Sequence, residues 1–442
     1  MVELFHQHPY WTISFVSFFV NIPLGYVRQG CQKFSASWFF WIHASIPVII
    51  YLRLSLGTSP VFIPVCIFFA VMGQIVGSRY RSRRMTPLDL EKYDRIADLN
   101  LPAPGPKPDD RDVAVVLLNM GGPRDVAGVK DFLHRLFLDP IIMKFPLSKI
   151  LQPFFAWLIV TLRLKEAQRR YQLIGGCSPI FDSTQRQAAA LGKELRERGR
   201  DVPVFFSFNY SEPFAEGVLT AIKKAGKKFV LPLSLYPHYS LATTGSNMFY
   251  LTEATKKVYP GAQFLSAPAY YLHDDYIQAF ADRIQAQLKP GESLDEFYII
   301  FSAHGLPLYF LTQGDLYPFQ IAQTAACVLR KLERAQHWSI SYQSAVGPMQ
   351  WLKPSTESVL HALARRNVKK LIVVPISFVT DHIETLCEID IEYRHVAEKA
   401  GISDFRMSRA LECHPGFIKA LADTVEATLP VDRGSCLATG GT

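Results

Sequence analysis

The fold of this chain is decided by the stretch Phe297-Tyr298-Ile299-Ile300-Phe301-Ser302-Ala303-His304-Gly305-Leu306-Pro307. An apolar run of strand length gives way to a histidine, a glycine and a proline, which predicts a buried strand followed by a turn. In an open α/β sheet, ligands bind at the carboxyl ends of the strands. His304 would project there, and an imidazole suits a general base at neutral pH. A structural role for such a lone histidine is the alternative.

A second segment of the same kind follows the apolar run Leu371–Phe378. Asp381, Glu384, Glu388 and Glu392 are separated by three, four and four residues, so they form one acidic stripe on a helix. Together with His382, these oxygen ligands suit a loosely held divalent cation. A solvated helix face, with Asp381 as the helix N-cap, is the alternative.

Strand and helix patterns alternate from residue 112 onward, which predicts parallel sheets covered by helices on both faces. Strands are expected at Val113–Leu118, Val202–Phe208, Phe229–Leu235, Phe297–Phe301, Ile340–Gln343 and Leu371–Phe378. Helices are expected at Val126–Phe137, Phe214–Ala225, Tyr276–Leu288, Ile321–Arg334, Glu357–Arg366 and Ile383–Lys399. We expect two similar doubly wound α/β lobes, residues 112–255 and 256–430, with a ligand crevice between them and a tail at 431–442.

The N-terminal 84 residues differ from the rest of the chain in composition, because they are mostly apolar. Three runs, Trp11–Val27, Phe34–Leu52 and Leu54–Gly77, contain no Asp, Glu, Lys or Arg and approach the length that crosses a bilayer. They predict a membrane section of about three transmembrane helices, followed by a proline-rich linker at 85–111. A hydrophobic hairpin lying on the membrane is the alternative.

Charge sets the expected orientation of this section. Lys and Arg number 47 against 39 Asp and Glu, a net charge of +8, and part of the excess is the cluster Arg79–Arg84. Because the cluster directly follows an apolar run, it indicates a membrane flank and not a nucleic-acid surface. The positive-inside rule then places the N-terminus outside and everything after residue 84 in the cytoplasm.

Taken together, these segments resemble the ferrochelatases, the family that inserts ferrous iron into a porphyrin. The resemblance covers residue 113 to about 428. Its landmarks occur in the family's order at Leu118–Pro123, Tyr171 with Ile174–Pro179, Tyr236–Ser240, Thr243–Ser246, Phe301–Pro307, Gly314–Pro318, Tyr342–Ser344 with Val346–Pro348, and Phe378 with Asp381–Leu386.

The resemblance implies a class II chelatase-like fold and a role for individual residues. His304 matches the catalytic histidine, Glu384 matches its acidic partner across the macrocycle, and both match metal-binding positions. A path for protons or metal is implied at Asp381, His382, Glu388 and Glu392. Porphyrin contacts are implied at Met120, Tyr171, Ser178, Tyr210, Trp351 and Phe378.

Three departures from the family pattern affect the expectations. Asn209 and Ala345 stand where many relatives carry a basic residue, which puts contacts to the porphyrin propionates and the metal-entry path in doubt. Only Cys413 and Cys436 lie near the C-terminus, so we expect no iron–sulfur cluster. No fixed cofactor is expected, because Fe²⁺ is a substrate that leaves with the product.

The expected function is insertion of Fe²⁺ into protoporphyrin IX, the terminal step of haem biosynthesis, by an enzyme held at the membrane by its N-terminal helices. Association with the preceding enzyme of the pathway is a further expectation, and binding to nucleic acid is not. Coproporphyrin as the substrate, a cobalt chelatase acting on a corrin precursor, and a non-catalytic porphyrin or haem carrier are the alternatives. Oligomeric state and the face by which metal enters stay open.

Overall fold

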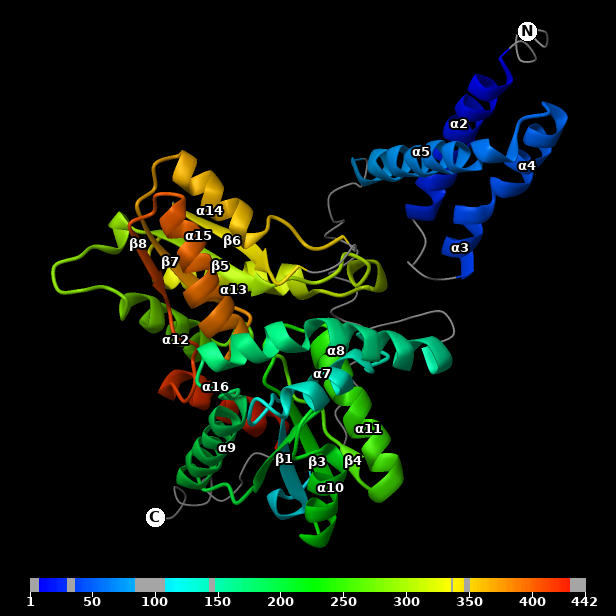
Figure 1. Ribbon diagram of the computed structural model, residues 1–442. Coiled ribbons are helices and arrows are strands. Elements are labelled where there is room, and N and C mark those ends of the chain that lie inside the picture. The colour runs from blue at the N-terminus through cyan, green and yellow to red at the C-terminus, as the bar shows by residue number, and fades with distance from the viewer. Residues whose placement is uncertain are drawn as a thin grey trace, which may run out of the picture. The chain divides into compact units, whose positions relative to one another are not determined.

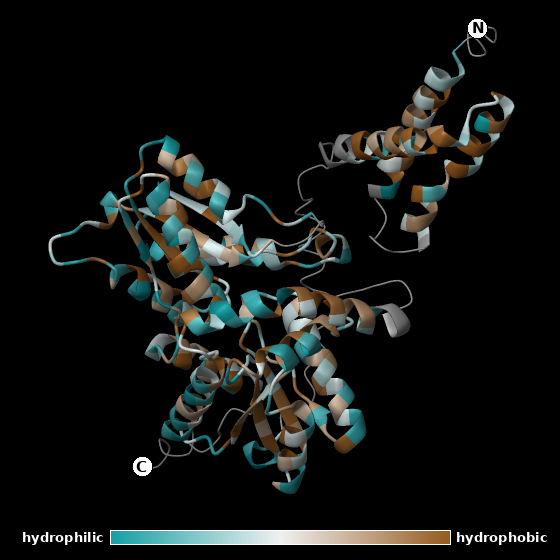
Figure 2. Cartoon of the chain, viewed as in Figure 1, coloured by the Kyte–Doolittle hydropathy of each residue, from teal (hydrophilic) through white to brown (hydrophobic). Residues whose placement is uncertain are grey.

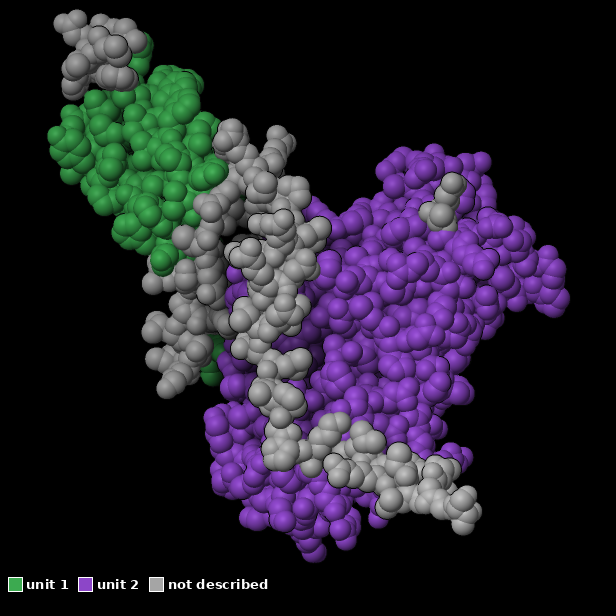
Figure 3. All heavy atoms as spheres, turned by 180° about the vertical axis from the view of Figure 1, so that it is seen from behind, with its two compact units in different colours: residues 1–95, 143–155 green, residues 96–142, 156–442 purple. Residues whose placement is uncertain are grey.

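The computed structural model describes residues 8–29, 36–83, 108–142, 148–334, 337–345 and 350–429. The chain divides into two compact units, residues 1–95 with 143–155, and residues 96–142 with 156–442 (Figure 3). Apart from residues 108–111, the expected linker at 85–111 lies outside the described residues, as does the expected tail. Each unit is described by itself below.

The first unit is a group of apolar helices (Figures 1 and 2). Its elements are α2 (Pro9–Gln29), α3 (Ala36–His43), α4 (Ile46–Ser55), η1 (Pro60–Phe62) and α5 (Ile63–Arg83). Three segments are long and apolar enough to cross a membrane, namely Pro9–Arg28, Ser37–Ser55 and Pro60–Ser78. Their number and positions match the three apolar runs expected from the sequence.

The middle segment is interrupted between α3 and α4, and buried polar side chains meet at the break. Pro47 occupies the first turn of α4, where a proline has no N–H to bond the preceding turn. The Gln74 amide on α5 donates to the main-chain oxygen of Trp41 and to Oδ1 of Asn21, both at 3.0 Å. The Ser45 hydroxyl also donates to Asn21, at 3.0 Å. These bonds satisfy polar groups that an apolar surrounding would otherwise leave unpaired.

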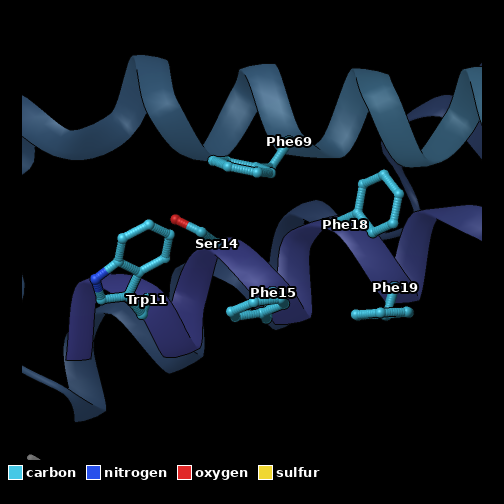
Figure 4. Close-up of a pocket in the computed structure, with 6 residues that line it drawn as sticks. All are labelled: Trp11, Ser14, Phe15, Phe18, Phe19 and Phe69. Atoms are coloured by element: carbon cyan, nitrogen blue, oxygen red, sulfur yellow. The ribbon is translucent and has the colours of Figure 1, made fainter. Parts of the chain in front are cut away.

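Helices α2 and α5 pack at close range. A Cβ atom on Gly73 would lie 2.1 Å from the Phe18 carbonyl oxygen, and one on Gly77 would lie 1.8 Å from that of Ile22. Small residues at such crossings let two backbones approach within an apolar medium. A pocket of about 200 Å³ on these two helices is lined by Trp11, Ser14, Phe15, Phe18, Phe19 and Phe69 (Figure 4).

The second unit holds two parallel four-stranded sheets with the same strand order (Figure 1). The first sheet runs β2-β1-β3-β4 and contains β1 (Val113–Asn119), β2 (Val204–Phe208), β3 (Phe229–Ser234) and β4 (Gln263–Phe264). The second runs β6-β5-β7-β8 and contains β5 (Tyr298–His304), β6 (Trp338–Gln343), β7 (Lys370–Pro375) and β8 (Asp404–Met407). The prediction of two similar doubly wound lobes is confirmed.

Helices cover both faces of each sheet, because the central strands are apolar on both sides. Alternate residues of β1 separate cleanly: Val115 joins a core that extends through both lobes, whereas Val116 joins the core beneath α10 and α11. The helices are α7 (Val129–Phe137), α8 (Ser148–Leu173), α9 (Ile180–Glu197), α10 (Ala215–Lys224), α11 (Ser246–Val258), α12 (Asp274–Gln285), α13 (Tyr317–Lys331), α14 (Thr356–Arg365), α15 (Arg394–Lys399) and α16 (Pro415–Thr428). Shorter helical turns are η2 (Asp110–Asp112), η3 (Leu241–Gly245), η4 (Leu294–Glu296) and η5 (Leu311–Gln313).

The structure differs from the sequence pattern at two places in this unit. The lobe boundary expected at residue 255 falls inside α11, and β4 at 263–264 still belongs to the first sheet. The single α-helix expected at Ile383–Lys399 is a π-helical stretch, η6 (Glu384–Tyr393), that continues into α15. Hydrophobic periodicity cannot distinguish these two helix types, and π-helical turns occur frequently at functional sites.

Candidate active site

The candidate site lies at the carboxyl ends of three neighbouring strands of the second sheet, β6, β5 and β7. His304 is the last residue of β5, and it pairs in register with Gln343, the last residue of β6. The chain leaving β7 carries Phe378 and then Glu384, the first residue of η6. Since β5 has β6 on one side and β7 on the other, connections leave its end in opposite directions, and this opens a site in a doubly wound sheet.

His304 and Glu384 are in direct contact. Nδ1 of the imidazole lies 3.0 Å from Oε2 of the carboxylate, and the two side chains are 31% and 28% exposed. Nε2 is therefore the ring nitrogen turned away from this contact. The two side chains touch in this structure, so they do not stand apart on opposite sides of a ring-sized gap as expected. Both groups lie together at the carboxyl end of β5.

The contact changes the pKa of both partners. Burial lowers the pKa of His304, but the charge and hydrogen bond of Glu384 outweigh it, so the pKa is raised overall. Burial raises the pKa of Glu384, but the His304 imidazolium, its hydrogen bond and then His382 outweigh it, and that pKa falls to about 2. The carboxylate therefore stabilises the protonated imidazole, and His304 is a stronger base than a free imidazole.

His382 lies beside this pair in an apolar setting. Its Nε2 is 3.8 Å from Oε2 of Glu384, and its ring meets the edge of Phe378 with centroids 4.4 Å apart. Burial lowers the pKa of His382, so the neutral form is favoured. Its buried Nδ1 has no hydrogen-bond partner among the described residues. A neutral imidazole with an open nitrogen is a common metal ligand.

The acidic residues expected on one stripe divide into separate environments. Glu388 is buried and accepts hydrogen bonds from the Ser344 main chain at 2.8 Å and the Tyr393 hydroxyl at 3.0 Å. Burial, and then the charge of Glu384, raise its pKa, so Glu388 holds a proton more readily than an exposed acid.

The other two acids are engaged elsewhere. Glu392 forms an ion pair with Arg170 of α8, with Nε to Oε1 at 2.7 Å. Asp381 accepts from the Thr385 hydroxyl at 3.1 Å and from the Ala410 main chain at 3.3 Å. The structure thus brings Glu384 and Glu388 together with the histidines, whereas Asp381 anchors the turn before η6.

The first lobe supplies aromatic groups toward Glu384. Burial, and then the charge of Glu384, raise the pKa of Tyr171 at the end of α8 and of Tyr236 after β3. Ser178 is buried beside the turn after β1: its main chain donates to Pro123 at 2.8 Å, and a Cβ on Gly122 would lie 2.5 Å from its Oγ. Sequence reasoning quoted Tyr236 in a motif but assigned it no contact.

The remaining residues expected to contact the porphyrin differ in burial and in the partners that they already have. The Tyr210 hydroxyl donates to the buried carboxylate of Asp139 at 2.5 Å, so that hydroxyl is already used. Met120 is half-buried at the end of β1, and Trp351 is half-buried and bridged to Pro307. Phe378 is buried, with its ring centroid 6.3 Å from that of His304.

The two departures from the family pattern leave neutral groups. The Asn209 amide donates to the Ser246 hydroxyl at 3.1 Å, and Ala345 is exposed just after β6. Neither position can pair with a propionate as a basic residue would.

Two residues that hydrogen-bond the main chain of His304 were not predicted from the sequence. The Ser377 hydroxyl accepts from the His304 main-chain N–H at 3.0 Å, and the Tyr317 hydroxyl donates to its carbonyl at 3.0 Å. Both residues are buried. The sequence showed only that Tyr317 lies close to the His304 motif along the chain. Its bond to the His304 carbonyl depends on how α13 packs.

A separate group, His273, Asp275 and Asp423, also has metal-ligand types within reach of one another. Its carboxylates are already paired with Lys419 at 3.1 Å and with Arg198 at 2.5 Å. Because these cations neutralise the group, it is better explained as a salt-bridge network between α12 and α16.

The fold and site define a chelatase-like α/β protein. The family model for ferrochelatase matches residues 112–429. A ferrochelatase of Synechocystis sp. is 43% identical over 321 residues, 72% of this chain and 82% of that protein. One of Gloeobacter violaceus is 41% identical over 323 residues, 72% of this chain and 98% of that protein. Among solved structures, SirB from Bacillus subtilis with Fe³⁺ matches with a TM-score of 0.43 and 16% identity, over 55% of this chain and 89% of that chain.

The chain belongs to the ferrochelatase family. It is an enzyme of haem biosynthesis that binds iron as a substrate and inserts it into a porphyrin.

Proposed function

We propose that this ferrochelatase inserts Fe²⁺ into protoporphyrin IX to form protohaem, with His304 as the proton acceptor and Glu384 as its acidic partner. The observation that carries the proposal is the 3.0 Å contact between these side chains at the end of a buried strand. The contact strengthens the imidazole as a base and leaves Nε2 to meet the substrate. General bases of this kind work best when the pKa lies near the working pH.

The proton balance of insertion fits this pair. A free-base porphyrin loses two pyrrole protons as Fe²⁺ takes its four nitrogens. His304 Nε2 accepts one proton, and the Glu384 carboxylate stabilises the resulting imidazolium. That proton must leave before the second is taken, and Glu388, whose pKa is raised, lies next along η6 to receive it. His382, whose Nε2 lies 3.8 Å from Glu384, is favoured in the neutral form that suits a ligand for Fe²⁺.

The choice of protoporphyrin is supported by the neutral residues at two positions where many relatives carry a cation. Asn209 and Ala345 supply no cation, and the other contacts proposed for the ring are largely aromatic or apolar. A porphyrin with two carboxylates therefore suits the site better than coproporphyrin, which has four. No resident cofactor and no iron–sulfur cluster enter this mechanism.

The test is anaerobic Fe²⁺ insertion by the full chain in detergent, followed by the absorbance of haem, with protoporphyrin IX and coproporphyrin III compared. His304→Ala should lower kcat by about 100-fold or more, as expected for loss of a general base, with porphyrin binding retained. His361→Ala, on the exposed side of α14, is the control. Normal insertion by His304→Ala would contradict the roles, and a preference for coproporphyrin III would contradict the substrate.

The membrane section has its own proposal. We propose that three helices cross the membrane, with the N-terminus outside and the catalytic part in the cytoplasm, where it can receive an apolar porphyrin from a membrane-bound preceding enzyme. The three long apolar segments and the basic residues that flank them support this orientation. Reporter fusions at the N-terminus and at residue 100 should lie on opposite sides, and the same side for both would contradict an odd number of crossings.

A further inference from the structure

Gln343 occupies a special place in the site. It is the last residue of β6, it pairs in register with His304, and it is 1% exposed. The sequence motif that contains it marks the family, but the mechanism proposed above gives it no task. A buried amide offers two donors and two acceptor positions, and each needs a partner.

Both ends of the Gln343 amide are bonded, and the bonds have a fixed direction. Nε2 donates to the main-chain oxygen of Glu384 at 3.0 Å, and Oε1 accepts from the Ser302 hydroxyl at 2.8 Å. A carbonyl can only accept, so the atom that faces Glu384 must be the nitrogen. The Ser302 hydroxyl must then donate to Oε1.

A buried hydroxyl chain supports this orientation. The Ser302 hydroxyl contacts that of Thr356 at 3.1 Å, and Thr356 contacts the Ser341 hydroxyl at 2.9 Å. All three side chains are fully buried. Because Ser302 donates to Gln343, it accepts from Thr356, and Thr356 accepts from Ser341. Such a chain polarises in one direction and resists rotation of the amide at its end.

The main chain of Gln343 is hydrogen-bonded beside His304, the other member of the His304–Glu384 pair. Its carbonyl accepts from Gly305 N–H at 2.8 Å, directly after His304. A Cβ on Gly305 would lie 2.5 Å from that carbonyl oxygen, so the two strand ends can approach this closely because residue 305 is glycine. Gln343 is thus bonded through its backbone next to His304 and through its side chain to Glu384.

We infer that Gln343 is a positioning residue that sets the separation between His304 and Glu384 by holding the first residue of η6 against the end of β5. The expected effect on kcat rests on the proposed function, whereas the expected effect on the distance between the two side chains does not. Without the amide, the backbone of Glu384 loses its bond to β6, and the carboxylate no longer meets Nδ1 at a fixed distance.

Gln343→Met tests this inference, because methionine has a similar length and no hydrogen-bonding amide. In the full chain, kcat for Fe²⁺ insertion should fall about 10- to 100-fold, as expected for a misplaced catalytic group, with KM for porphyrin within about twofold. Gln320→Met is the matched control, because Gln320 is also buried and bonds a main-chain N–H, that of Tyr239 at 2.6 Å. The control should lose comparable thermal stability and keep its kcat. A kcat for Gln343→Met equal to that of the control would overturn the inference.

A double-mutant cycle separates positioning from general damage. In a Glu384→Gln background, Gln343→Met should lower kcat by less than about twofold, because the contact that it positions is already gone. The same fold-loss in both backgrounds would overturn the inference. Should Gln343→Met not fold, Ser302→Ala frees the amide from the other side and should lower kcat several-fold by the same route, and a wild-type kcat would count against it.

A structural readout keeps this test independent of the proposed function. In a crystal structure of Gln343→Met, the Nδ1–Oε2 distance between His304 and Glu384 should be longer than in the wild-type protein determined alongside it. An unchanged distance would overturn the inference whatever the activity. A wild-type protein that inserts no iron, but whose Gln343→Met variant shows the longer distance, would contradict the proposed function alone.

Discussion

Nδ1 of His304 lies 3.0 Å from Oε2 of Glu384, although 80 positions separate the two residues in the chain. The contact joins the end of β5 to the start of η6, and it leaves Nε2 of the imidazole turned away from the carboxylate. In the proposed mechanism the carboxylate acts through the histidine. This geometry makes the basicity of His304 depend on Glu384.

Glu384→Gln should weaken His304 as a base. Removing the carboxylate charge lets burial dominate, so the pKa of His304 falls from its raised value. The acidic limb of the pH profile of kcat should then move to lower pH, while kcat falls about 10- to 100-fold. Glu357→Gln on the exposed surface of α14 is the control. An acidic limb that moves to higher pH would show that another group controls it.

Gly305→Ala should separate the ends of β5 and β6. The new methyl group would lie 2.5 Å from the Gln343 carbonyl oxygen, which is backbone and cannot rotate away. Overpacking of this kind costs about 1–3 kcal/mol of unfolding free energy, and the displaced His304 should also lower kcat.

The matched control is Gly217→Ala in α10, where an added Cβ meets nothing within 4 Å. That change should stabilise the protein by about 0.5–1 kcal/mol, because alanine loses less backbone entropy in a helix. Thermal unfolding and kcat of both variants check the pair, and a fully active Gly305→Ala would mean that the strand ends tolerate separation.

The strands could be predicted because their signal is local. Val113–Leu118 and Phe297–Phe301 are apolar runs buried on both faces, so composition alone identifies them, and His304 could be placed at a strand tip from the turn that follows. Contacts between distant segments have no such signal. The Gln343 amide reaches Glu384 across 41 positions, and only the packed strand order brings them together.

Helix type and side-chain direction also could not be predicted from the sequence. The spacing of Glu384, Glu388 and Glu392 fits an α-helix, but η6 is π-helical. Their partners outside η6 are His304 at the end of β5, Ser344 after β6 and Arg170 of α8. Asp381 fits the same stripe by spacing, yet it is held by Thr385 and the Ala410 main chain. Spacing can show which residues share a face, whereas the partner across that face is set by tertiary packing.

His238 should make the protein less stable in acid. It is 1% exposed, and its Nε2 contacts the Thr324 hydroxyl at 2.9 Å. Burial lowers its pKa from 6.5 to about 3, so the folded protein excludes a proton that the unfolded chain binds. Stability is therefore complete above pH 6.5 and is lost as the pH falls toward 3. At pH 5 this group alone should cost about 2 kcal/mol.

His238→Gln isolates that contribution, because other histidines titrate in both proteins. The midpoint of thermal unfolding should fall less steeply between pH 7 and 5 in the variant than in the wild type. Parallel pH dependence in the two proteins would show that His238 is not held neutral.

Gln74→Leu should destabilise the apolar helices without touching the catalytic unit's chemistry. The amide donates to the Trp41 carbonyl at the break between α3 and α4 and to Asn21. Leucine removes this donor from the Trp41 carbonyl and leaves Oδ1 of Asn21 with the Ser45 hydroxyl as its donor. Hydrogen bonds between helices in a membrane contribute about 1–2 kcal/mol in peptides, so a loss of that size is expected in unfolding by a denaturing detergent. Val71→Leu, on an exposed face of α5, should change the midpoint little. If Gln74→Leu were instead as stable as the wild type, packing at Gly73 and Gly77 would be sufficient to hold α2 against α5, and the polar contacts at the break would be dispensable.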